Sequence, residues 1–195
     1  MDYVVETATT AEIMTLAEFK AACRVGHSEQ DSLLSDLLAA ALDTVQLDQS
    51  RLFLPQTIEF KIKRFPADGG PIWAPATPLR NITEIRYTDG SGVATTLNEA
   101  AADLICELDT YTEPHKIKLK YDQSWPDGTD VIIKVEAGYV DSGSVPKRFK
   151  QAVAQLGSFL YHNPDNPAHR LPDVVDRLLM PTRLWRYKRD YAKQK

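Results

Sequence analysis

The chain has 195 residues, of which 43% are hydrophobic, so it can bury one core and support a small appendage. Its net charge of -4 argues against a protein whose whole surface binds nucleic acid. The charge is nevertheless uneven. The first fifty residues hold nine acids and two bases, whereas the last thirteen hold six bases and one acid. The two ends of the chain therefore carry opposite charge.

The cysteines and the apolar segments exclude two further classes of protein. Cys23 and Cys106 lie far apart, with neither a C-x-x-C spacing nor a small secreted framework around them, so we expect free thiols in a reducing compartment. The N-terminus has no cationic stretch followed by an apolar core. No apolar run approaches the roughly 18 residues that a bilayer span needs, so we expect no membrane association.

The N-terminal quarter predicts a leader and two helices. Residues 1–14 are polar and without a period, which indicates a flexible leader. Thr15 and Glu18 have the spacing of a capping box, which predicts a helix over 15–25. Ser28 opens a second predicted helix over 28–49, with Asp31 three residues on as its reciprocal cap. The charged residues of this helix are all acids. That uniformly negative face is either solvated or built to meet a positive surface.

The middle of the chain, residues 56–140, predicts an antiparallel sheet of six strands. Most of its strands alternate apolar and polar residues, as half-buried strands do. The proline-rich segment 65–79 is expected to form an edge or a loop pinned by Ile72 and Trp73. We also predict a strand around Leu104 to Leu108. Lysines recur on the polar side of several strands and would give one side of the sheet a positive field if those strands pair. The alternative, which we slightly prefer, is that lysine at these positions discourages unwanted strand pairing.

Two more helices follow, over 145–163 and 173–182, separated by a segment with three prolines. Pro146 suits the first position of the earlier helix, and Phe149 begins an apolar face with spacings of four, three and four. The first turns of this helix also carry a cationic shoulder, which is either a solvated face, the interpretation we favour, or a partner site. The shoulder consists of Lys147, Arg148, Lys150 and Gln151.

No pattern in the sequence predicts enzyme chemistry. The four histidines are scattered without the spacing of a metal site, and the glycines lack the lysine and helix start of a phosphate loop. No G-x-S-x-G elbow is present, and nothing near the paired acids Glu107 and Asp109 suggests a cleft. We therefore expect no catalytic residues, no metal, no cofactor and no enzymatic activity.

The last thirteen residues, 183–195, interleave aromatic and basic side chains. Such a tail is typical of segments that bind single-stranded nucleic acid or that fold on a protein partner. Trp, Tyr and Arg dominate protein hot spots, and this tail follows a helix and not a sheet platform, so we favour a protein partner. A nucleic-acid-binding module that uses the tail directly remains the alternative.

Several segments, in this order, resemble the head-tail connector (adaptor, head-completion) proteins of tailed bacteriophages over about Thr15 to Trp185. They read TLAEFKAACRV, SEQDSLLSDLLAAALD, FPADGGPIWAPATPLRNITEIRYTDGSG, QSWP, AGY, VPKRFKQAVAQLGSFLYHN and LPDVVDRLLMPTRLW. The resemblance implies an α+β fold, a helical bundle of about four helices with an inserted antiparallel β-sheet domain. The connector domain would span 15–182, between the leader and the tail.

The resemblance also implies a structural and non-enzymatic role in the virion neck, between the capsid portal and the tail. The chain would form a ring, expected to hold twelve copies, that binds the portal protein, extends the channel for double-stranded DNA without sequence specificity, and offers a platform for the next tail or stopper component. Assembly would take place in the host cytoplasm, without a membrane.

Two sets of site residues follow from these expectations. Rings need heterologous interfaces, so we expect the acidic helix of one subunit to meet strand lysines of its neighbour, and we expect the tail to dock on the portal. The predicted subunit-interface residues are Asp31, Asp36, Asp43, Lys61, Lys63, Lys116, Lys118 and Lys120. The predicted portal-docking residues are Arg183, Leu184, Trp185, Arg186, Tyr187, Lys188, Arg189 and Tyr191.

Overall fold

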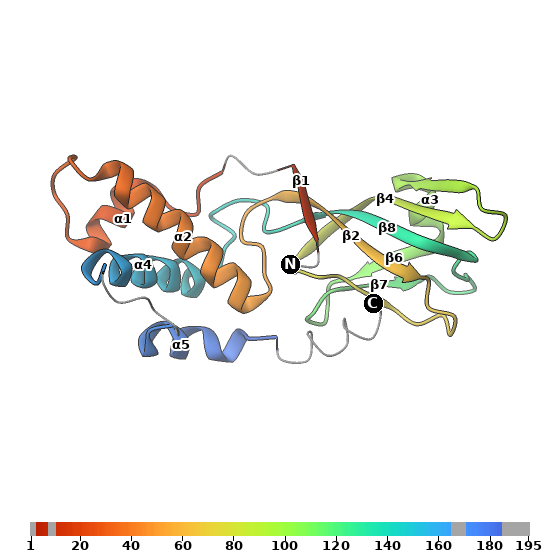
Figure 1. The fold of residues 1–195 in the computed structure, drawn as a ribbon. Helices are drawn as coiled ribbons and strands as arrows, with labels where there is room; N and C mark the ends of the chain where they lie inside the picture. Colours follow the sequence, from red (N-terminus) through yellow and green to blue (C-terminus); the bar gives the residue numbers. More distant parts are fainter. Residues whose placement is uncertain (1–2, 8–10, 165–170, 185–195) are drawn as a thin grey trace. The chain divides into compact units, whose positions relative to one another are not determined.

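The computed structural model describes residues 3–7, 11–164 and 171–184. These residues form two units (Figure 1). The helical unit consists of Ala11–Leu54 and Val140–Arg183, and the sheet unit has Pro55–Tyr139 as its main part. The predicted α+β fold, a helical bundle interrupted by an antiparallel sheet, is thereby confirmed.

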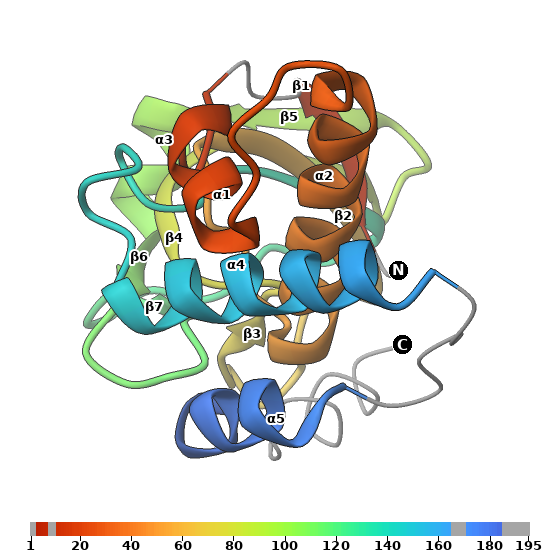
Figure 2. The same ribbon diagram turned by 90° about the vertical axis from the view of Figure 1, so that its left-hand side faces the viewer.

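The helical unit contains four helices at the places that the sequence predicts. Figure 2 shows α4 crossing in front of α2, with α5 below it. The capping box of the first helix forms as expected, because the Glu18 backbone N–H donates to the Thr15 hydroxyl (3.2 Å) and the Thr15 N–H donates to the Glu18 carboxylate (2.8 Å). The helices are α1 (Leu16–Cys23), α2 (Asp31–Gln49), α4 (Lys147–His162) and α5 (Asp173–Leu179), followed by the 3-10 turn η1 (Met180–Thr182).

The start of α2 differs from the expectation. Its N-cap is Gln30 and not Ser28, and no side chain caps it. The carboxylate of Asp31 binds the ammonium group of Lys20 in α1 at 2.6 Å. Asp31 therefore ties two helices together where the sequence suggested a reciprocal cap.

The core of the helical unit lies along one face of α4. Phe149, Val153 and Leu156 of the predicted apolar face are buried, and the Phe149 ring stacks on Phe53 with 4.7 Å between ring centroids. Gly157 sits in the middle of this helix, where glycine is normally unfavourable. The backbone of Gly157 lies so close to Phe19 that a Cβ would come within 2.6 Å of two ring carbons. Glycine is needed here for the close approach of α1 to α4.

The sheet unit contains a five-stranded antiparallel sheet in the order β1-β2-β8-β4-β5 and a three-stranded sheet in the order β3-β7-β6. In the larger sheet, Ile58 pairs with Val135 and Phe60 with Ile133, so the predicted alternation places these apolar residues in the core. The strands are β1 (Val4–Thr7), β2 (Gln56–Arg64), β3 (Ile72–Trp73), β4 (Leu79–Asp89), β5 (Ala94–Asn98), β6 (Cys106–Asp109), β7 (Lys116–Leu119) and β8 (Gly128–Ala137).

Two elements of the sheet unit were not expected. Residues 4–7, expected to lie in a flexible leader, form β1 at the edge of the larger sheet. All four side chains of β1 are exposed, so the strand is held by backbone hydrogen bonds to β2 and by an ion pair between Glu6 and Lys134 (2.6 Å). Because no side chain of β1 is buried, its sequence has no apolar alternation from which a strand could be predicted. The expected strand at Leu104 to Leu108 begins only at Cys106. Before it lies α3 (Glu99–Ile105), whose first turn is capped by the Asn98 side chain.

Candidate docking and subunit-interface surfaces

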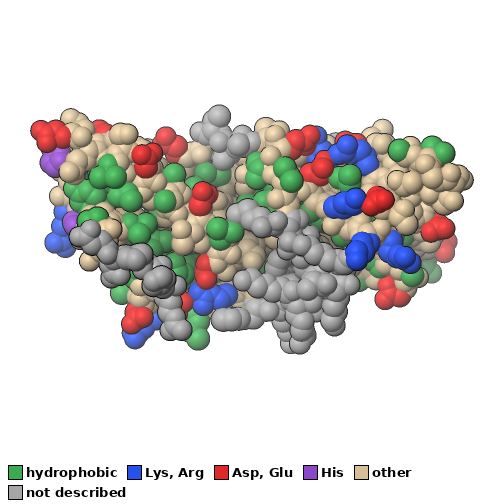
Figure 3. Space-filling view, viewed as in Figure 1, with side chains coloured by type: hydrophobic (Ala, Val, Ile, Leu, Met, Phe, Trp, Pro, Cys, Tyr) green, Lys and Arg blue, Asp and Glu red, His purple; other side chains and the backbone are tan. Residues whose placement is uncertain are grey.

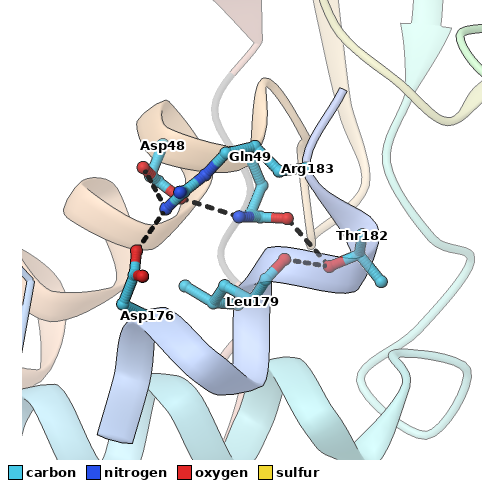
Figure 4. A network of polar contacts seen from close by, with 6 residues as sticks. All are labelled: Asp48, Gln49, Asp176, Leu179, Thr182 and Arg183. Atoms are coloured by element: carbon cyan, nitrogen blue, oxygen red, sulfur yellow. Dashed lines mark hydrogen bonds and ion pairs between the residues drawn. The ribbon is translucent and has the colours of Figure 1, made fainter. Parts of the chain in front are cut away.

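The C-terminal end of the helical unit is fixed by Arg183, whose guanidinium group binds two carboxylates (Figure 4). Its Nη2 lies 2.8 and 2.9 Å from the two oxygens of Asp48, its Nε lies 3.2 Å from the same carboxylate, and its Nη2 is 2.9 Å from Asp176. Because the Asp48 carboxylate accepts these hydrogen bonds, the pKa of Arg183 is raised above its ordinary value. Arg183 therefore joins the end of α2 to α5.

A buried amide extends this contact. Gln49 is fully buried; its side-chain nitrogen donates to Asp48 at 2.7 Å, and its oxygen lies 2.9 Å from the hydroxyl of Thr182. The Thr182 hydroxyl is also 2.9 Å from the Leu179 carbonyl at the end of α5. We refer to Asp48, Gln49, Asp176, Thr182 and Arg183 as the Arg183 clamp.

The clamp changes the expected extent of the C-terminal tail. Arg183 was predicted to dock on the portal as part of that tail, yet in this structure its charge is paired within its own unit. A free tail therefore starts no earlier than Leu184, which is partly buried. The other predicted docking residues lie outside the described residues, namely Trp185, Arg186, Tyr187, Lys188, Arg189 and Tyr191.

The acids predicted for a subunit interface on α2 fall into two groups. Asp31 is bound to Lys20, as described above. Asp36 and Asp43 are exposed, and neither forms an ion pair within the part of the chain that the structure describes. They lie seven residues apart, which places them on the same side of the helix. Asp36 and Asp43 are therefore the acids of α2 that are available to a partner.

The strand lysines do not form the single positive face that we considered. Lys61 and Lys63 belong to β2 in the larger sheet, whereas Lys116 and Lys118 belong to β7 in the smaller one, and Lys120 follows β7. The condition for a shared face, that these strands pair, is not met.

Several of these lysines are also neutralised by acids of the sheet unit. Lys116 lies opposite Asp109 in the ladder and 3.5 Å from it, and Lys118 lies opposite Glu107 at 3.2 Å. The ammonium group of Lys61 is 2.7 Å from Asp130. Cross-strand pairing with local acids is thus the role that the structure gives these side chains.

The structure brings together no group of side chains suited to metal or nucleophile chemistry within its described ranges. Among those residues, no three His, Cys, Asp or Glu side chains could hold one ion. Both cysteines are buried and outside any disulfide, and burial raises the pKa of the Cys23 thiol. Buried His115 accepts a hydrogen bond at Nδ1 from the Leu79 N–H (3.0 Å), so it supports the fold. No helix among the described residues is both long and apolar enough to cross a bilayer.

The family of the chain follows from its sequence. A family model described as phage gp6-like head-tail connector protein matches residues 13–134, which is more than half of the chain. The chain belongs to this family. The expected resemblance is thereby confirmed, and the family is one of structural connector proteins and not of enzymes. Among curated proteins, none matches this family member in sequence.

Solved structures similar to this connector-family chain come from gene transfer agent (GTA) particles. A chain in the virion of a native GTA particle has 21% identity and a TM-score of 0.76, with 94% of this chain and 95% of that chain covered. A chain in the neck of an empty particle, computed with C6 symmetry, has 23% identity and a TM-score of 0.74 with the same coverage. A chain in the neck of a native particle, computed with C12 symmetry, has 20% identity and a TM-score of 0.68, with 92% and 94% covered. At these identities the likeness shows a shared fold.

Proposed function

We propose that this chain is the subunit of a head-tail connector ring in the virion neck. The ring binds the portal protein, extends the channel for double-stranded DNA and offers a platform for the next tail or stopper component. The observation that carries the proposal is the match of the connector family model over residues 13–134.

The similar structures support the ring and its place. Two of the three similar chains belong to particle necks, and one of those necks was computed with C12 symmetry. A ring of twelve copies is therefore the arrangement that we propose. A closed ring needs two different patches on each subunit, one for each neighbour.

We propose further that the segment after Arg183 docks on the portal. The Arg183 clamp supports this, since it ties residue 183 to α2 and so holds the start of that segment at one place on the helical unit. A fixed starting point lowers the entropy that a peptide loses when it binds. Leu184, Trp185 and Tyr187 are the proposed anchors.

Electron microscopy of the purified chain, alone and mixed with the portal protein of the same phage, tests the ring. We expect rings of twelve copies seated on the portal. A mixture in which the chain stays monomeric and the portal stays bare would contradict the proposal.

A deletion tests the docking segment. Removal of residues 185–195 keeps the Arg183 clamp, so we expect an unchanged melting temperature together with a loss of portal binding, measured by co-sedimentation. A deletion that begins at Arg183 is unsuitable, because it removes the clamp as well. Portal binding that survives the shorter deletion would rule out the docking role.

The rival role, in which the tail binds nucleic acid directly, predicts a different set of responses. Phosphate contacts lose affinity steeply as salt rises, whereas an aromatic protein contact loses less. We therefore expect W185A/Y187A to weaken portal binding more than R186A/K188A, and added salt to have a small effect. The reverse order, with tight binding of single-stranded DNA, would favour the rival.

A further inference from the structure

The exposed side of α2 carries a regular stripe of apolar and acidic residues. Leu33 and Leu47 are 49% and 50% exposed although they are large and apolar, and Ala40 lies between them, seven residues from each. Asp36 and Asp43 repeat at the same interval. Residues that recur every seven positions follow one side of a helix, as in helices that pack on other helices. We call Leu33, Asp36, Ala40, Asp43 and Leu47 the α2 stripe. Figure 3 shows hydrophobic side chains gathered over the helices, with acidic side chains among them.

The helical unit also has a groove, formed along the exposed side of α4. The groove has a volume of about 530 Å³, and its lining includes the small residues Ala22, Ala154 and Ser158 together with the larger apolar residues Phe159 and Val174. Val174 is 59% exposed. A groove lined by small and apolar side chains can accept the ridge of another helix. We call this the α4 groove.

Two further features of the α4 groove bear on its partner, namely a cationic end that suits an acidic surface and an unpaired acceptor that needs a donor. Lys147 and Arg148, the first residues of α4, are exposed and form no ion pair among the described residues. Lys147 precedes the groove residue Gln151 by one helical turn, so the cationic shoulder extends the groove along the same side of α4. The Gln155 side-chain oxygen is buried in the groove wall and has no hydrogen-bond partner within the described part of the chain. An unpaired buried acceptor is costly until a partner supplies a donor.

The α2 stripe and the α4 groove lie on opposite sides of the packed helices. The buried side of α2 includes Leu34, Ala41 and Val45, which are half a turn away from Asp36 and Asp43. The buried side of α4 includes Phe149 and Val153 and likewise points away from the groove. Since α2 and α4 pack together through their buried sides, each copy presents the stripe on one side and the groove on the other.

We propose that the α2 stripe of one copy packs over the α4 groove of a second copy, with Asp36 and Asp43 near Lys147 and Arg148. The proposal rests on the connector ring proposed above and names the contact between neighbours. It keeps the acidic half of the interface expected from the sequence and replaces the strand lysines by the cationic shoulder. Because the stripe and the groove are different patches, each copy can contact one neighbour through its stripe and the other neighbour through its groove. A closed ring requires such an interface.

Charge reversal tests the pairing. Full-length variants D36K/D43K and K147E/R148E are mixed with the portal protein, and ring formation is followed by native mass spectrometry and electron microscopy. We expect each variant to need at least about tenfold more protein to form rings, because like charges then face each other. The quadruple variant, in which both sides are reversed, should regain most of the loss. E12K/E29K, which changes two exposed acids of the same unit outside the α2 stripe, is the matched control and should assemble normally.

Cross-linking provides a second measurement that does not depend on charge. Copies with A40C are mixed with copies with Q151C, and disulfide-linked dimers are expected only when both variants are present in one ring. If the wild type forms rings while either charge-reversed variant assembles equally well, or while mixed A40C and Q151C copies give no cross-link, this contact is overturned and the connector function stands. Failure of the wild-type chain to form rings on the portal would instead overturn the proposed function, and this contact with it.

Discussion

The ring of Phe19 in α1 occupies the space that a side chain at Gly157 in α4 would need, with two ring carbons 2.6 Å from the position of a Cβ. Gly157→Ala should therefore destabilise the helical unit, although alanine favours a helix by about 1 kcal/mol. Overpacking in a rigid core typically costs about 1 to 3 kcal/mol. Less the helix gain of about 1 kcal/mol, this leaves an expected net loss of up to about 2 kcal/mol, measured by urea unfolding.

The control for this substitution is Gly26→Ala. No atom lies within 4 Å of a Cβ at Gly26, so this variant should unfold like the wild type. A Gly157→Ala variant as stable as Gly26→Ala would show that α1 can shift away from α4 at no cost.

The Arg183 clamp predicts a second loss of stability. Arg183→Ala leaves Asp48 and Asp176 facing the same space without their shared cation, and hydrogen bonds to charged groups contribute about 1.5 to 3 kcal/mol. We expect the free energy of unfolding to fall by about 2 kcal/mol. Arg177→Ala removes an exposed arginine of α5 and should change the free energy of unfolding by less than about 0.5 kcal/mol.

A double-mutant cycle separates the pairing from the loss of a long side chain. If Arg183 and Asp48 interact directly, the combined variant Arg183→Ala/Asp48→Asn should be more stable than the sum of the two single losses predicts. Additive losses would argue that the clamp contributes through packing alone.

The capping box of α1 predicts an acid-sensitive contribution to stability. The pKa of Glu18 is lowered from its ordinary value because the backbone N–H of Thr15 and then its hydroxyl donate to the Glu18 carboxylate. A carboxyl group whose pKa is lower in the folded state stabilises that state above the unfolded pKa, and the contribution disappears as the pH falls through the folded pKa. The wild type should therefore be more stable than Glu18→Gln at pH 7, and the difference should shrink as the pH falls below the ordinary glutamate pKa of about 4.3.

Melting temperatures of both proteins between pH 7 and pH 3 check this. Glu12→Gln, at an exposed glutamate that precedes the helix, controls for the loss of a negative charge. A difference between wild type and Glu18→Gln that persists unchanged at pH 3 would contradict the charged capping box.

The four helices of the helical unit could be predicted well because each has a local signal at its start or on its buried face. The pairing of Thr15 with Glu18 and the spacing of Phe149, Val153 and Leu156 both reflect contacts within one helix. The expected cap at Ser28 was wrong because Asp31 is bound by Lys20, eleven residues earlier, and no local rule contains that contact.

The sheet unit was harder to predict, because its organisation depends on which strands pair. Alternation identifies β2 and β8, yet it does not say that β7 pairs with β3 and β6 in a separate sheet. The strand β1 has no buried side chain and so carries no apolar period. The short helix α3 interrupts a segment that we expected to be extended.

The candidate surfaces could likewise be predicted only where the signal lies within one element of secondary structure. That Asp36 and Asp43 are exposed follows from the helical period, but the pairing of Lys116 and Lys118 with Asp109 and Glu107 could not be known without the strand register. The role of Arg183 was also hidden, since its partners Asp48 and Asp176 come from two different helices. The seven-residue interval of the α2 stripe was present in the sequence and would have signalled a packing face.

The pairing of Gln56 with Ala137 has a consequence for how such a protein changes over time. The segment Pro55–Tyr139, the main part of the sheet unit, begins and ends in adjacent strands, so its two ends lie close together. An inserted segment of this kind can gain residues, lose residues or be replaced without moving the ends of the helices that flank it. Two surfaces of one subunit can then adapt to new neighbours separately, each at its own pace.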